Sequence, residues 1–306
     1  MDPDELYTLR AQFWLGHFDL CLAESKSLAR RPMSPNLKLE REEFLHRANI
    51  ALGKYSKVIS ETSDASGSLK ALHLHASYEA AASRSVPDTA EMESIVNEMK
   101  SLLASSSSDL TTSLQLTAAH VFLRHNLTRE ALQCVHLGTS MEHIVLSLQI
   151  YLKIDRLDLA AGQLSLLKQA DEESVLTQLG SVYYKIATGK SGADDALHSL
   201  NMMTEQYGTS TMLSNLTAVV YLTAGNFPAA ERVLLEAKEE LETSGIPNAD
   251  TWINLVVCAS QMGKVKEANE YVLYLKTNFS SHPFVTNLER VENAFDRESI
   301  KYVVGA

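Results

Sequence analysis

Gly225-Asn-Phe-Pro-Ala-Ala-Glu-Arg-Val-Leu-Leu-Glu-Ala237 is the clearest copy of a pattern that runs through the whole chain. A turn residue, Gly225, is followed after one position by the bulky Phe227 and then by the small Ala230, and apolar side chains return at Leu234 and Ala237. Spacings of three and four place these side chains on one face of a helix, and a glycine at this point is typical of the end of a preceding helix. The segment therefore predicts the turn and the second helix of a helical hairpin.

The pattern recurs at regular intervals along the chain. Gly263-Lys-Val-Lys-Glu-Ala268 and Asp155-Arg-Leu-Asp-Leu-Ala160 are close copies, and four weaker copies complete the series. The small positions of the seven copies are Cys21, Val58, Ala131, Ala160, Ala196, Ala230 and Ala268. They lie 29 to 38 residues apart, except for one interval of 73 residues that contains two further predicted helices over 70–104. Eight units of roughly 35 residues account for the chain, and such a period is typical of a solenoid.

Each turn is preceded by a second helical stripe, such as Trp252, Leu255 and Ala259 before Gly263. Two antiparallel helices joined by a short turn cross closely just beyond it, and a small side chain leaves room for that crossing. A single hairpin cannot bury both of its sides, so successive hairpins stack. We therefore expect an all-α fold, an α-solenoid of about eight helical hairpins. It would form a single domain over 1–306, with 281–306 as a C-terminal capping helix and tail.

The spacing of Trp252, Leu255, Gly263, Ala268 and Leu275 resembles that of the tetratricopeptide repeat. The resemblance implies a tetratricopeptide-like helical array. The other copies are degenerate, and the turn over 189–195 is lengthened by an insertion. These departures from a regular repeat leave room for an array that is flattened or curled into a closed form.

Composition narrows the possible functions. With 27 basic and 38 acidic residues the net charge is −11, which disfavours binding to nucleic acid or directly to an anionic membrane surface. Cys21, Cys134 and Cys258 are too far apart for a zinc motif or a disulfide framework, so we expect a reducing compartment. The acidic N-terminus predicts no signal peptide, and the longest uncharged stretch, 206–230, has too many polar and turn residues to enter a membrane. We expect a cytoplasmic protein.

The candidate catalytic motifs are weak. Gly189-Lys-Ser191 ends like a phosphate-binding loop, but Tyr184 stands where that loop needs its first glycine, and a helix precedes it instead of a strand. His73 and His75 are two residues apart, so on a helix they point to nearly opposite sides and cannot share a metal. We therefore expect no catalytic site, no metal and no cofactor, and a protein that is not an enzyme.

A binding surface is the remaining functional feature. Solenoids of this type present the first helix of each hairpin to a concave face, which binds an extended peptide or a partner domain. The repeat register places on this face several residues that the hairpin core does not need. The predicted partner-binding residues are Val145, Gln149, Met212, Asn215, Val219, Ile253 and Val257.

Five segments narrow the resemblance to one family. These segments resemble the epsilon subunit of coatomer, the coat of vesicles that move between Golgi cisternae and back to the endoplasmic reticulum. They are Arg41–Ala48, Leu148–Ala160, Trp252–Val257, Ser281–Phe284 and Glu292–Arg297. The resemblance implies a non-catalytic structural subunit that binds the C-terminal domain of the alpha subunit. It also implies peripheral attachment to Golgi membranes through the coat. The alternative is a cytosolic tetratricopeptide-repeat adaptor that scaffolds a different protein complex.

Overall fold

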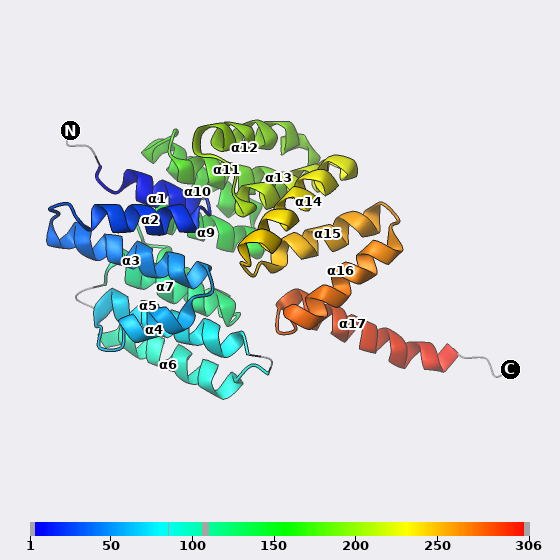
Figure 1. Cartoon of the computed structure of the whole chain (residues 1–306), viewed down its shortest axis with the longest axis horizontal. Helices are drawn as coiled ribbons and strands as arrows, with labels where there is room; N and C mark the ends of the chain where they lie inside the picture. The colour runs from blue at the N-terminus through cyan, green and yellow to red at the C-terminus, as the bar shows by residue number, and fades with distance from the viewer. Residues whose placement is uncertain (1–3, 85, 106–109, 303–306) are drawn as a thin grey trace.

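The computed structural model describes residues 4–84, 86–105 and 110–302, and Figure 1 shows them as a curled array of helices. The helices are α1 (Tyr7–Trp14), α2 (Phe18–Leu28), α3 (Pro35–Ala51), α4 (Tyr55–Glu61), α5 (Gly67–Ala82), α6 (Thr89–Ser105), α7 (Thr112–Arg124), α8 (Thr128–Val135), α9 (Met141–Lys153), α10 (Leu157–Ala170), α11 (Val175–Ala187), α12 (Ala193–Tyr207), α13 (Thr211–Ala224), α14 (Phe227–Ser244), α15 (Ala249–Gln261), α16 (Val265–Asn278) and α17 (Pro283–Ser299). Two short 3₁₀ helices, η1 (Lys190–Gly192) and η2 (Ile300–Tyr302), complete the secondary structure.

Each odd-numbered helix from α1 to α15 packs against the even-numbered helix that follows it, which gives eight hairpins. The predicted pair of helices over 70–104 is present as α5 and α6. No strand occurs in the described part of the chain. The prediction of an all-α solenoid of about eight hairpins is therefore confirmed.

The small residues of the repeat lie where the hairpins cross. Six of the seven positions have no exposed surface, and Ala268 is 8% exposed. Gly225 ends α13 with a positive φ of 82°, and Asn126 and Asp155 hold the equivalent position with φ of 61° and 57°. Only glycine adopts this left-handed conformation freely, and asparagine and aspartate are the next most tolerant. This is why the turn residue of the repeat is Gly, Asn or Asp.

The array curls back on itself. Residues Ala11 and Leu15 of α1 share a hydrophobic core with residues of α11, α12 and α13. The Ser210 hydroxyl, at the start of α13, donates a 2.6 Å hydrogen bond to the Leu15 carbonyl. A Cβ added at Gly16 would lie 2.9 Å from the Met212 Cβ, so the turn between α1 and α2 touches the start of α13. The first hairpin thus packs against the sixth and seventh.

The C-terminal helix α17 extends away from the curl, as Figure 1 shows. Its first turn packs through Phe284 and Val285 against the core of the last two hairpins. A 2.6 Å ion pair between Lys276 and Glu292 ties it to α16. The last part of the predicted tail, residues 303–306, lies outside the described residues.

Candidate partner-binding groove

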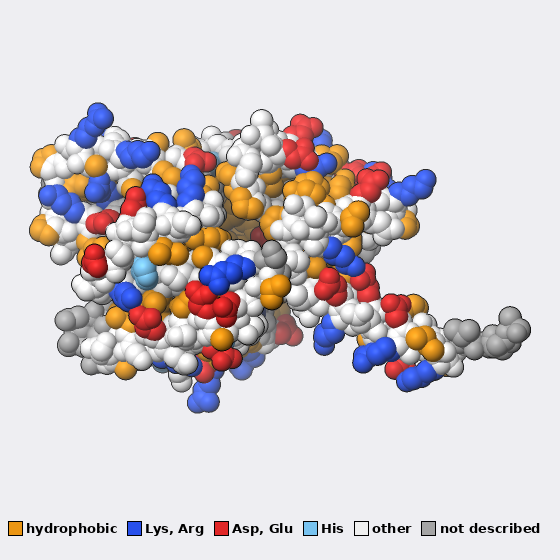
Figure 2. All heavy atoms as spheres, turned by 60° about the horizontal axis from the view of Figure 1, so that its bottom comes forward, with side chains coloured by type: hydrophobic (Ala, Val, Ile, Leu, Met, Phe, Trp, Pro, Cys, Tyr) orange, Lys and Arg blue, Asp and Glu red, His pale blue; other side chains and the backbone are white. Residues whose placement is uncertain are grey.

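Three cavities of about 620, 250 and 370 Å³ lie along the inner side of the curl. Arg47 lines all three, Trp14 and Glu142 are common to the first two, and Phe13 and His120 are common to the last two. The lining comes mainly from the odd-numbered helices α1 to α13. Figure 2 shows hydrophobic side chains gathered around a hollow near the centre of one face. We call the three adjacent cavities the inner groove.

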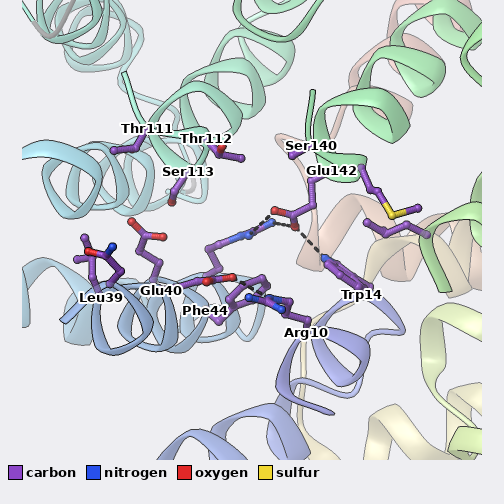
Figure 3. Close-up of a pocket in the computed structure, with 15 residues that line it drawn as sticks. Arg10, Trp14, Leu39, Glu40, Phe44, Thr111, Thr112, Ser113, Ser140 and Glu142 are labelled. Carbon is purple, nitrogen blue, oxygen red and sulfur yellow. Dashed lines mark hydrogen bonds and ion pairs between the residues drawn. The ribbon is translucent and has the colours of Figure 1, made fainter. Parts of the chain in front are cut away.

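An ion pair crosses the middle of the inner groove. Nη2 of Arg47 on α3 lies 2.8 Å from Oε1 of Glu142 on α9, and Nε1 of Trp14 on α1 donates a 2.8 Å hydrogen bond to the same oxygen (Figure 3). The Arg47 guanidinium also lies over the Phe13 and Phe44 rings, 4.5 and 4.7 Å from their centroids. One carboxylate thus joins the first, second and fifth hairpins.

Glu142 stays ionised at this buried position. Burial alone would raise the pKa of its carboxyl group, but the Arg47 charge and the hydrogen bonds from Arg47 and Trp14 outweigh that effect and hold the pKa below its usual value. Glu142 also occupies the first turn of α9, where the positive end of the helix dipole favours a negative charge. Glu142 is therefore negatively charged in the folded protein.

The groove also holds two neutral histidines. The His75 and His120 rings are stacked, with centroids 6.4 Å apart and planes 2° from parallel. Burial lowers the pKa of each to about 4. His73 faces elsewhere, with Nδ1 3.2 Å from Oγ1 of Thr62. This confirms that His73 and His75 point apart. Separately, the described residues contain no group of three or more His, Cys, Asp or Glu side chains able to hold a metal.

The structure also places the other weak catalytic motifs of the sequence. Gly189–Ser191 forms part of the turn between α11 and α12, and its preceding element is the helix α11, as predicted. Burial raises the pKa of Cys21 to about 12 and that of Cys134 to about 11, so both thiols are protonated and unreactive at neutral pH. In the ranges described, no helix is long and apolar enough to cross a membrane.

The structure separates the predicted partner-binding residues into three groups. Val145, Gln149 and Met212 line the same cavity of the inner groove, although Val145 is only 7% exposed. Asn215 is buried between helices, where its amide donates to the hydroxyl of Thr251 at 2.8 Å. This hydrogen bond and the burial make Asn215 part of the hairpin packing.

The remaining three predicted residues lie beyond the cavities described above. Val219 on α13 is half-buried. Ile253 packs at the edge of the hydrophobic core of the last two hairpins. Val257 on α15 is 38% exposed. Their role in partner binding stays a prediction.

Sequence reasoning missed the groove residues of the first four hairpins. Trp14, Arg47 and His120 belong to inner helices of early units. The register could have placed each of them on an inner helix. Their convergence depends on the curl, because Trp14 and Glu142 are 128 residues apart in sequence.

A second apolar surface lies on α17 and the turn after it. Val291, Phe295 and Tyr302 are 59%, 71% and 80% exposed. Val291 and Phe295 are four residues apart and lie on one side of α17, and Tyr302 follows in η2. Figure 2 shows hydrophobic atoms on this extension, among charged ones. Contacts with the rest of the described residues leave these side chains exposed.

Known proteins resemble the chain over nearly its whole length. Residues 2–303 match the family model of the coatomer epsilon subunit. Coatomer subunit epsilon-1 of Arabidopsis thaliana is 33% identical, and the match covers 96% of this chain and 96% of that protein. The coatomer subunit epsilon of Dictyostelium discoideum is 30% identical, and the match covers 97% of this chain and 98% of that protein. A tetratricopeptide repeat protein from Parabacteroides merdae has a similar fold, with a TM-score of 0.53, 12% identity and coverage of 93% and 95%. The chain therefore belongs to the coatomer epsilon subunit family.

Proposed function

We propose that this chain is a non-catalytic structural subunit that binds the C-terminal domain of the coatomer alpha subunit in its inner groove and stabilises the coat. As a family member, it is a component of coatomer. The proposed transport steps are from the Golgi to the endoplasmic reticulum and between Golgi cisternae. The chain would act in the cytoplasm and reach Golgi membranes only through the assembled coat.

The observation that supports partner binding most strongly is the row of adjacent cavities that forms the inner groove. Concave solenoid surfaces bind extended segments, and aromatic side chains supply much of the contact area in such sites. Phe13, Trp14 and Tyr183 provide aromatic surface here, and Gln149 provides an amide for polar contacts. This combination suits a polypeptide better than a small polar metabolite.

The chemistry of the groove supports a non-catalytic role. Glu142 is paired with Arg47, and the pKa values of His75 and His120 are about 4, so these three groups are weak bases at neutral pH. None of these groups has the pKa near neutrality that suits acid–base catalysis.

Co-elution of the purified chain with a C-terminal fragment of the alpha subunit tests the proposal. We expect a stoichiometric complex in size-exclusion chromatography at micromolar concentrations. A chain that elutes alone under these conditions would refute alpha-subunit binding and favour the adaptor alternative. Mass spectrometry of proteins captured from cytosol would then identify the other complex.

We also propose that residues 1–306 form a single domain. The packing of Ala11 and Leu15 into the core of α11–α13 supports this, because it links distant parts of the chain. One cooperative unfolding transition is the expected result. Two separate transitions, with proteolytic fragments that fold alone, would contradict it.

A further inference from the structure

The charges around the widest cavity of the inner groove do not balance. Five charged side chains line this cavity of about 620 Å³: Arg10, Glu40, Glu43, Arg47 and Glu142. Arg10 lies 2.7 Å from Glu40, and Arg47 lies 2.8 Å from Glu142. Among the residues that the structure describes, no ion pair involves Glu43. With all five side chains ionised, three negative charges face two positive charges, so one negative charge is unmatched.

Glu43 is also the least exposed acid of the cavity, with 7% of its surface exposed. Burial raises the pKa of its carboxyl group. The hydroxyls of Ser68 and Ser113 and the charge of Arg47 lower the pKa, but burial has the larger effect. A buried carboxylate without a counter-charge costs folding free energy, whereas a cation placed beside it recovers much of that cost.

The surroundings of Glu43 suit a cation supplied from outside. Figure 3 shows Thr111, Thr112 and Ser113 along one side of the cavity, on and just before α7. An ammonium or guanidinium group has several donors and no acceptor, so it needs oxygen atoms such as these hydroxyls in addition to a carboxylate. Arg47 would repel a cation, but its charge is already neutralised by Glu142.

We propose that Glu43 receives a basic side chain, lysine or arginine, from the polypeptide that occupies the inner groove. The inference rests on the proposed function, because it requires an occupant of the groove. The inference adds to the proposed function a contact residue of this chain, Glu43, and a positive charge on the partner. Charge pairing at a buried position selects the register of the bound segment, since any other residue type leaves the carboxylate unmatched.

The test compares Glu43→Gln with Glu93→Gln. Glu93 is exposed on α6, so its substitution changes the net charge equally without touching the groove. Affinity for a C-terminal fragment of the alpha subunit is measured by isothermal titration calorimetry. We expect E43Q to bind at least about 30-fold more weakly than the unaltered chain, because the partner's cation is left buried without a carboxylate. E93Q should bind like the unaltered chain.

Two further measurements separate a charge effect from a structural one. E43Q should be as stable as the unaltered chain or more stable, since it removes a buried charge. Glu43→Asp, which keeps the charge, should retain more affinity than E43Q; equal losses in both variants would overturn the inference. Unchanged binding by E43Q would overturn it as well and leave the proposed function intact. Absence of binding by the unaltered chain would overturn the proposed function and this inference together.

Discussion

Replacing Glu142 by Gln should weaken the contact that joins the first two hairpins to the fifth. The glutamine amide can still accept the hydrogen bond from Trp14, because it keeps one carbonyl oxygen. It cannot neutralise Arg47, whose guanidinium remains in place over the Phe13 and Phe44 rings. The substitution therefore removes the charge of the pair and keeps its size.

The expected loss follows from the burial of the pair. The Arg47 and Glu142 side chains are 14% and 17% exposed. Removing one partner of a fully buried pair costs about 3–5 kcal/mol, and an exposed pair contributes about 0–1 kcal/mol. A mostly buried pair should lie between these limits, so we expect a loss of about 2–3 kcal/mol. At about 2 °C per kcal/mol for a large domain, the melting temperature should fall by roughly 4–6 °C.

Urea and thermal unfolding followed by circular dichroism provide the assay. Glu298→Gln is the matched control, because Glu298 pairs with Lys301 on the exposed end of the chain, with both side chains more than 60% exposed. E298Q should unfold like the unaltered protein. If E142Q and E298Q unfold at the same temperature, the ion pair does not stabilise the curl and the reasoning is wrong.

Three further substitutions test other parts of the account. Ala230→Trp should lower the free energy of unfolding by about 1–3 kcal/mol or more through overpacking at a fully buried crossing, and unaltered stability in urea would contradict the hairpin register. Val219→Asp or Val257→Asp should weaken the complex with the alpha-subunit fragment and keep the helical content in circular dichroism; an unaltered complex excludes that residue from the contact. His75 and His120 have folded pKa values of about 4, below the ordinary 6.5, so stability should fall as the pH drops from 6.5 toward 4, by up to about 1.4 kcal/mol per pH unit for each histidine. Unfolding of the double variant H75Q/H120Q should depend less on pH in this window, and identical profiles would refute the assignment.

The hairpins could be predicted from the sequence because their determinants are local. A turn residue such as Gly225 and a small residue such as Ala230 lie five positions apart, and both constraints act within one hairpin. Asn126 and Asp155 fit the same turn because they tolerate a positive φ. The repeat therefore identified the helices, their pairing and the residues at the crossings.

The groove could be predicted only in part, because it depends on the curl. The hydrogen bond from Ser210 to Leu15 joins residues 195 positions apart, and no local pattern specifies it. Val145 and Gln149 were found because α9 is an inner helix in any solenoid of this register. Glu43 could not be singled out, since its lack of a counter-charge appears only when the surrounding helices are in place.

Photo-crosslinking tests the central claim, partner binding on the inner side of the curl, most directly. Benzoylphenylalanine is placed at Gln149, which lines the inner groove on α9, or at Leu166, which is 46% exposed on α10 of the same hairpin. Irradiation with the C-terminal fragment of the alpha subunit should give a crosslinked product from position 149 and none from position 166. Crosslinking from position 166 alone would place the partner on the outer side and contradict the account.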